Sequence, residues 1–300
     1  SDLDLFNSAI IMILFTSITS PLLVQKFAPK LQTQIDEVEA LPLFKRILVP
    51  IVNPETQKNL LSLASLLATT AEGSVIALNV AREGHGQNYE KTSQKELLGK
   101  VPDLLEDPET KIELVPRLSK NYAEGILQAS MEQEASIILM GWRGKRNLQQ
   151  NILGSILDEV IWGSDLPVMV GKLPHSINGM KRVLLLLTSK VIAHEVLHRI
   201  LMANISLARS LNVPLDVLAD ESYLSKTTDI LESMAGDLEY RIKKMDGQLR
   251  INDLHKHTDS DILVIPGYGS RQRFLANIGN LPERLAASFE GNIILLHFVR

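Results

Sequence analysis

Residues 136–144 read SIILMGWRG, and the pair Gly154-Ser155 follows nine residues after Gly144. The apolar run predicts a buried strand over 136–140, and the residues after Gly154 predict a helix over 155–162. A strand, a glycine-containing loop and a helix in this order are typical of α/β proteins, in which ligands bind beyond the carboxyl ends of parallel strands. This stretch therefore predicts the fold class and a candidate ligand site together.

The same alternation extends on both sides of this stretch. Short apolar runs predict strands at 46–52, 74–80, 112–118, 136–140 and 167–170, and amphipathic stretches predict helices at 54–70, 122–134 and 155–162. Strands that alternate with helices imply a parallel sheet with right-handed crossovers. We therefore expect residues 45–174 to form one α/β domain.

The plan of this domain recurs in the second half of the chain. The run KRILV that opens the first domain is echoed by KRVLL at the start of the second half. Gly144 and Gly154 have counterparts at the same mutual spacing in Gly269 and Gly279. The recurrence predicts two tandem copies of one α/β domain, with the second at 180–300.

Composition excludes several classes of function. The 300 residues include 31 Lys and Arg against 35 Asp and Glu, a formal charge of -4, so the chain lacks the basic footprint of a nucleic-acid-binding protein. The chain has no cysteine, which excludes disulfides, thiolate zinc sites, iron–sulfur clusters and a cysteine nucleophile. We therefore expect no nucleic-acid partner, and nothing in the composition requires a metal.

The amino-terminal segment has the length of a membrane span. Residues 5–25 contain no charged side chain. As a helix they cover about 31 Å, which is close to the ~30 Å hydrocarbon core of a bilayer. We expect a transmembrane helix within residues 1–29; the alternative is a buried helix of a soluble domain.

The basic residues Lys26 and Lys30 follow this apolar segment. Because positive charge concentrates on the cytoplasmic side of membrane proteins, we expect residues 30–300 to lie in the cytosol of a membrane-attached protein. The polar stretch 30–44 is expected to be a linker.

The glycine-rich loop after the strand at 136–140 permits two interpretations. Glycine at 141, 144 and 154 lets the backbone approach a phosphate, the helix amino terminus offers free N–H groups, and Arg143 and Ser155 add donors. Alternatively, Gly141 ends a strand, Gly144 makes a turn and Ser155 begins a capping box, none of which needs a ligand. The spacing alone leaves both interpretations open.

At these residues the sequence resembles the universal stress protein family, whose nucleotide-binding signature is Gly-x-x-Gly, nine residues and Gly-Ser. The opening strand ILVP (47–50) and the closing LPVMV (166–170) are similar to that family's first and last strands. The resemblance implies a five-stranded Rossmann-like fold for each copy, dimerisation, and an adenine nucleotide (ATP, ADP or AMP) as ligand.

The resemblance also implies roles for individual residues. It places two residues at the adenine and ribose, one more at the adenine, two beside the nucleoside, and the rest around the phosphates. In that order the expected nucleotide-binding residues are Pro50 and Val52, then Val80, then Met140 and Gly141, then Gly144, Gly154 and Ser155. Two neighbours complete the expected set: Arg143, whose charge could meet a phosphate, and Ile156, for which no separate role is expected.

One position departs from the family pattern. Val52 stands where the family usually has an aspartate that hydrogen-bonds the nucleoside. The variant Val-Pro-x-x-Asn-Pro at 49–54 resembles the tails of bacterial cation:proton antiporters of the monovalent cation:proton antiporter-2 family, and residues 8–23 resemble their last membrane helix. This second resemblance implies a cytosolic regulatory domain that senses a nucleotide and modulates sodium or potassium transport, with the transporter's membrane domain as partner and no enzymatic activity of its own.

Two further hypotheses compete with this function. The tail could serve only to dimerise the transporter, with both copies empty; in the second copy Gly279 is followed by Asn, which predicts a degenerate site. The motif His194-Glu-Val-Leu-His198 fits the zinc-peptidase pattern, but no third ligand is identifiable, so we expect two surface histidines on a packing helix and no metal.

Overall fold

The structure, a computed structural model, describes residue 12 and the ranges 43–52, 57–82, 94–105, 107–142, 155–188, 194–245, 260–270, 285 and 289–299. Residues Leu43–Arg300 form one compact unit and Ser1–Pro42 another. The helix predicted within 1–29 lies outside the described residues, except for Met12. In the part of the chain that is described, no helix combines the length and the apolar character that crossing a bilayer requires.

The first half of the unit Leu43–Arg300 contains the elements expected from the apolar pattern. They are β1 (Arg46–Pro50), α2 (Lys58–Thr70), β2 (Ser74–Arg82), a helix at 94–99, β3 (Lys111–Ser119), α4 (Tyr122–Glu132), β4 (Ile137–Gly141), α5 (Ser155–Gly163) and β5 (Val168–Lys172). The five predicted strands and three predicted helices are confirmed with small shifts of their ends. The helix at 94–99 was not predicted.

The second half repeats the alternation. Its elements are β6 (Arg182–Leu187), α6 (His194–Leu211), β7 (Leu215–Ala219), α7 (Glu221–Met234), β8 (Tyr240–Lys244), β9 (Asp261–Tyr268) and β10 (Asn292–Phe298). A short 3-10 turn at Ile177–Gly179 lies between the halves.

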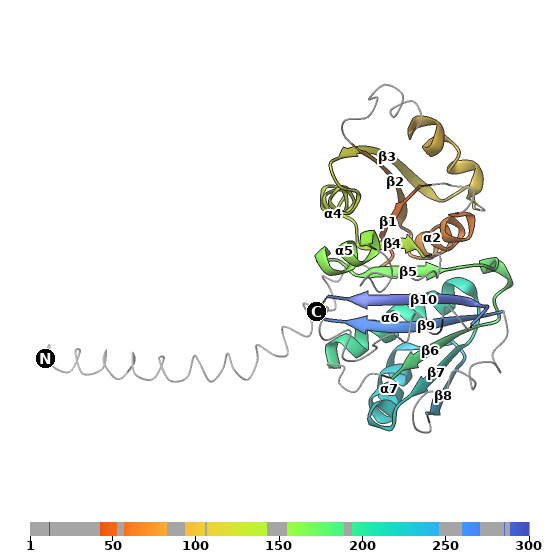
Figure 1. Cartoon of the computed structure of the whole chain (residues 1–300). Coiled ribbons are helices and arrows are strands. Elements are labelled where there is room, and N and C mark those ends of the chain that lie inside the picture. The colour runs from red at the N-terminus through yellow and green to blue at the C-terminus, as the bar shows by residue number, and fades with distance from the viewer. Residues whose placement is uncertain are drawn as a thin grey trace, which may run out of the picture. The chain divides into compact units, whose positions relative to one another are not determined.

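The ten strands of the described residues belong to one sheet with the order β3-β2-β1-β4-β5-β10-β9-β6-β7-β8. Within each half the strands run parallel, as the βαβ pattern requires. The α/β class is therefore confirmed. Each half contributes five strands, but the structure differs from the predicted pair of five-stranded sheets because β5 and β10 join the halves into one continuous sheet, at the centre of the unit Leu43–Arg300 in Figure 1.

The joint between the halves is antiparallel. Its register runs from Ile293 opposite Lys172 to His297 opposite Val168. Both strands are apolar and buried along most of their length. An exposed apolar edge strand is a template for aggregation, so pairing the two edges removes both unpaired backbone rows at once. Local periodicity does not reveal this pairing, because it depends on which edge meets which.

Alternate strand residues pack on the two faces of the sheet. On one face Ile47, Val49 and Ile51 of β1 contribute to a core that is covered by α2, the helix at 94–99, α6 and α7. On the other face Leu48 and its neighbours contribute to a core that is covered in the first half by α4 and α5. The two-residue period of a strand places successive side chains on these two faces.

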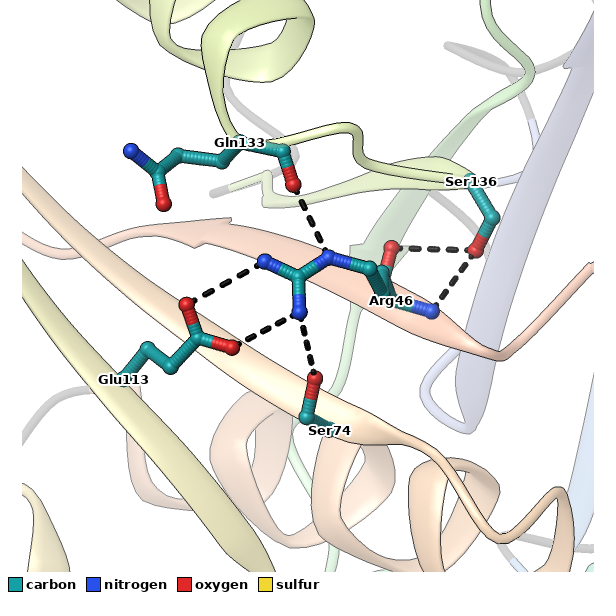
Figure 2. A network of polar contacts seen from close by, with 5 residues as sticks. All are labelled: Arg46, Ser74, Glu113, Gln133 and Ser136. Atoms are coloured by element: carbon teal, nitrogen blue, oxygen red, sulfur yellow. Dashed lines mark hydrogen bonds and ion pairs between the residues drawn. The ribbon is translucent and has the colours of Figure 1, made fainter.

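Arg46 ties the amino ends of the strands together (Figure 2). Its guanidinium donates to both carboxylate oxygens of Glu113 in β3, at 2.7 and 3.1 Å, and to the hydroxyl of Ser74 in β2 at 3.4 Å. Its Nε donates to the Gln133 carbonyl at 2.9 Å, and its backbone N–H donates to Ser136 Oγ at 2.9 Å. This network fixes the edge of the sheet that lies opposite the candidate site.

Candidate nucleotide site at the carboxyl ends of β1 and β4

The strand order places a topological switch point between β1 and β4. The two strands are paired in parallel. After β1 the chain continues into α2 on one face of the sheet, whereas after β4 it continues into α5 on the other face. Connections that diverge in this way leave a crevice beyond the carboxyl ends of the two strands, which is where open α/β sheets bind their ligands.

The structure brings four of the predicted site residues to this edge. Pro50 ends β1, and Met140 and Gly141 end β4. Val80 and Met140 both pack on the face covered by α4 and α5, and strand alternation places Pro50 on that face too. The side chains that were expected near the base therefore share one face at one edge of the sheet.

Most of the residues that were predicted to bind the phosphates are outside the described ranges. Arg143, Gly144 and Gly154 are outside the described residues, as is the side chain of Ser155. Ile156 lies in the first turn of α5 with 39% of its surface exposed. The contacts that the resemblance implies for the phosphates therefore stay predictions.

Val52 is strongly exposed, at 76%, one residue beyond the buried Ile51. Its backbone N–H donates to Gln57 Oε1 at 2.8 Å, and Gln57 Nε2 donates to the Pro50 carbonyl at 3.0 Å. The Gln57 amide thus pairs with two main-chain groups at the end of β1. Sequence reasoning missed Gln57 because a glutamine just before a helix carries no motif.

Gly141 lies next to Gln57. A Cβ built on Gly141 would be 3.6 Å from Leu60 Cδ2 and 4.0 Å from Gln57 Nε2, which are ordinary contact distances. Fold packing therefore does not demand a glycine here. The next residue, Trp142, is 8% exposed and belongs to the core on the α4–α5 face, so it packs in the interior.

Two helices border the α4–α5 side of this edge. Gly125 in α4 permits close contact with β2, because a Cβ there would come within 2.7 Å of Val80 Cγ1. The amide of Asn121, the N-cap of α4, donates to Glu159 Oε2 in α5 at 3.2 Å. At the end of β2, the Arg82 guanidinium lies 5.9 Å from the centre of the Tyr122 ring. Arg82 places a positive charge at this edge of the sheet, and no sequence motif identified it.

The corresponding turn of the second half continues the pairing of β9 with β10. Gly269, with φ +77°, donates its N–H to the Phe298 carbonyl at 2.9 Å. Its carbonyl accepts a hydrogen bond from His297 Nε2 at 3.0 Å. The main-chain groups of Gly269 are therefore satisfied by the end of β10, and the degenerate second site stays a prediction.

The zinc-peptidase motif lies on α6, as expected for a packing helix. Val196, Leu197 and Ile200 of this helix are buried, and His198 is half-buried. Within the described ranges, no three His, Cys, Asp or Glu side chains are grouped so that they could hold a metal ion. The side chain of His194 is not among those described.

The first half of the chain is similar to a known protein family. Residues 43–172 match the sequence profile of the Universal stress protein family. The chain contains a universal stress protein domain. The match covers β1 to β5 and therefore includes the switch point.

One curated relative and two solved structures extend the comparison. The Na(+)/H(+) antiporter NhaS5 of Synechocystis sp. is 29% identical over 202 residues, which cover 59% of this chain and 29% of the antiporter. A universal stress protein from Archaeoglobus fulgidus has a TM-score of 0.61 at 17% identity, covering 87% of this chain and 98% of its own. The cytoplasmic domain of a prokaryotic cation chloride cotransporter has a TM-score of 0.55 at 12% identity, covering 84% of this chain and 94% of its own.

These relatives differ in what they establish. At their low identities the two solved structures show a shared fold, and the likeness extends over both the universal stress protein domain and the second half. The chain spans less than a third of the length of the antiporter it matches. The similarity therefore does not by itself assign the antiporter's transport activity to this chain.

Proposed function

We propose that this chain is the cytosolic regulatory tail of a sodium or potassium:proton antiporter, and that it binds an adenine nucleotide (ATP, ADP or AMP) at the carboxyl ends of β1 and β4. The observation that carries the nucleotide part is the switch point at which Pro50, Val80, Met140 and Gly141 meet within a universal stress protein domain. The similarity to a Na(+)/H(+) antiporter supports the transporter part.

In this proposal residues 1–29 form the last membrane helix of the transporter, and 30–44 connect it to the cytosolic unit. The first domain, 45–174, binds the nucleotide through the residues at the switch point and through the loop that contains Gly144 and Gly154. The second, 180–300, does not bind it. Supporting this division, Asn280 follows Gly279 in the second copy, where the first copy has Ser155 after Gly154.

Regulation requires that the nucleotide bind two states of the tail with different affinities. The covalent path from the tail to the membrane helix is the linker at 30–44, so we propose that nucleotide-dependent changes act on transport through it. The tail itself carries out no chemical step in this proposal.

The second candidate function is a ligand-free tail that dimerises the transporter. We propose dimerisation in either case, because the family resemblance implies it. Since β5 is paired with β10 inside the chain, the strand edges left at the ends of the sheet are β3 and β8. Pro116 in β3 and Lys243 and Lys244 in β8 disfavour edge-to-edge pairing, so a dimer would form through other surfaces.

Isothermal titration of the chain with ATP, ADP and AMP tests the nucleotide proposal. Saturable heat is expected for the unmodified chain, and its loss is expected in Gly154→Trp. Gly99→Trp is the matched control, because a Cβ on Gly99 meets nothing within 4 Å, and it should bind as the unmodified chain does. Flat titrations with all three nucleotides, together with a dimer in sedimentation, would leave the ligand-free tail as the function.

A further inference from the structure

The end of β1 presents two hydrogen-bonding groups toward β4. In a parallel strand, neighbouring backbone groups alternate between the strands on either side. The N–H of Ile51 donates to the Leu78 carbonyl in β2 at 2.7 Å. The Pro50 carbonyl and the Val52 N–H therefore face the other side, toward β4, where the register pairs Ile47 with Ile137 and Leu48 with Ile138. These two groups lie at the switch point.

The side chain of Gln57 occupies this position. Its Oε1 accepts from the Val52 N–H at 2.8 Å and its Nε2 donates to the Pro50 carbonyl at 3.0 Å, so one amide pairs with both groups at once. Nε2 also lies 4.0 Å from where a Cβ of Gly141 would be, on the β4 side of the gap. The amide thus fills the place between the ends of β1 and β4.

A primary amide resembles the edge of a nucleobase. It offers one acceptor and one donor side by side, as adenine does with its N1 and its N6 amino group. A base that enters the switch point meets the same Pro50 carbonyl and Val52 N–H that Gln57 now engages. The amide and the base edge cannot pair with these two groups simultaneously.

We propose that Gln57 is a built-in competitor for the nucleobase, so that the nucleotide binds by displacing the Gln57 amide from the end of β1. This inference rests on the proposed nucleotide-binding function and adds a residue that weakens nucleotide binding. Substitutions in a binding site usually lower the affinity for the ligand, whereas removal of the Gln57 side chain is expected to raise the affinity for the nucleotide.

The test compares Gln57→Ala with the unmodified chain in titrations with ATP and with tripolyphosphate, which has no base. Each net hydrogen bond is worth a factor of roughly three to ten in an equilibrium constant, so ATP is expected to bind Gln57→Ala about tenfold more tightly. Tripolyphosphate is expected to bind both proteins equally. Gln133→Ala, which removes an amide at the opposite edge of the sheet, should bind both ligands like the unmodified chain.

Folding of the variant is checked by thermal denaturation. Gln57 is the N-cap of α2, but its side chain makes no capping hydrogen bond, so alanine leaves the helix terminus as it is. Unchanged or weaker ATP binding in Gln57→Ala would overturn the inference while the proposed function stands. Equal strengthening of tripolyphosphate would also overturn it, because Gln57 would then not compete with the base. Absence of ATP binding in both proteins would overturn the proposed function as well.

Discussion

The two halves share one plan of strands, yet their carboxyl edges differ. In the first half Val52 is 76% exposed beside Gln57, and Gly141 has room around its Cα. In the second half Gly269 is tied through both its N–H and its carbonyl to the end of β10. The glycine turn of the second half is therefore hydrogen-bonded to the neighbouring strand β10, whereas in the first half a side chain, Gln57, pairs with the main chain at the end of β1.

The ion pairs at the amino ends of the strands also differ between the two halves. Arg46 in the first half pairs with Glu113, whose side chain is 42% exposed. Arg182, at the equivalent position in the second half, donates to both oxygens of Asp261 and to Asp216, whose side chains are 2% and 6% exposed. The hydrogen bonds and charges of these aspartates raise the pKa of Arg182 above its usual value. The second half thus has the more deeply buried ion pairs.

The largest predicted effect tests this difference in burial. Arg182→Met removes the guanidinium that pairs with two buried carboxylates and is expected to lower the free energy of unfolding by about 3–5 kcal/mol. Arg46→Met exposes a partly solvated carboxylate to water, with an expected loss of about 1 kcal/mol. Urea denaturation of both variants measures the two losses; equal losses would contradict the claimed asymmetry.

The next prediction concerns His297, whose Nε2 donates to the Gly269 carbonyl in the second half. Burial lowers the pKa of this imidazole from 6.5 to about 4, and its ring also meets Trp162 edge-on at 5.3 Å between centroids. Because the unfolded chain binds a proton at higher pH than the folded chain does, stability is lost as pH falls from above 6.5 toward 4. Between pH 7 and pH 5 this loss should be about 2 kcal/mol.

His297→Phe is the variant that isolates this contribution. This substitution removes the titrating group. Between pH 7 and pH 5 the free energy of unfolding of His297→Phe should therefore fall by about 2 kcal/mol less than that of the unmodified chain. Chemical denaturation at the two pH values gives the difference. Parallel pH dependence in the two proteins would show that His297 is not buried in its neutral form.

The third prediction compares the two glycines. Gly269→Ala forces a side chain into the left-handed region at φ +77° and is expected to cost about 1–2 kcal/mol. Gly141→Ala places a Cβ at ordinary contact distance and should change stability by less than about 0.5 kcal/mol. Thermal unfolding separates the two, and a large loss in Gly141→Ala would mean that packing requires that glycine.

Much of the first half could be predicted from its sequence, because buried strands and amphipathic helices leave a periodic pattern. The strand at 136–140 and the helix at 155–162 appear within a residue of their predicted ends. The residues Pro50, Val80, Met140 and Gly141 lie at one edge of the sheet, since parallel strands bring their carboxyl ends together, and their binding role stays a prediction.

The remaining features depend on contacts between distant parts of the chain. No local pattern tells that β5 pairs with β10, so the single ten-stranded sheet was not predicted. Spacing identified Gly269, but its hydrogen bonds to Phe298 and His297 follow from how β10 ends beside β9. Gln57 acts through its position before α2, and its residue type alone gives no signal.

The central claim is that the first half alone binds an adenine nucleotide. Calorimetric titration of the chain with ATP, repeated for Gly141→Val and Gly269→Ala, tests it most directly. The account predicts one ATP per chain, binding that is abolished or strongly weakened in Gly141→Val, and unchanged affinity and stoichiometry in Gly269→Ala. Two ATP per chain, or loss of binding in Gly269→Ala with full binding in Gly141→Val, would contradict it.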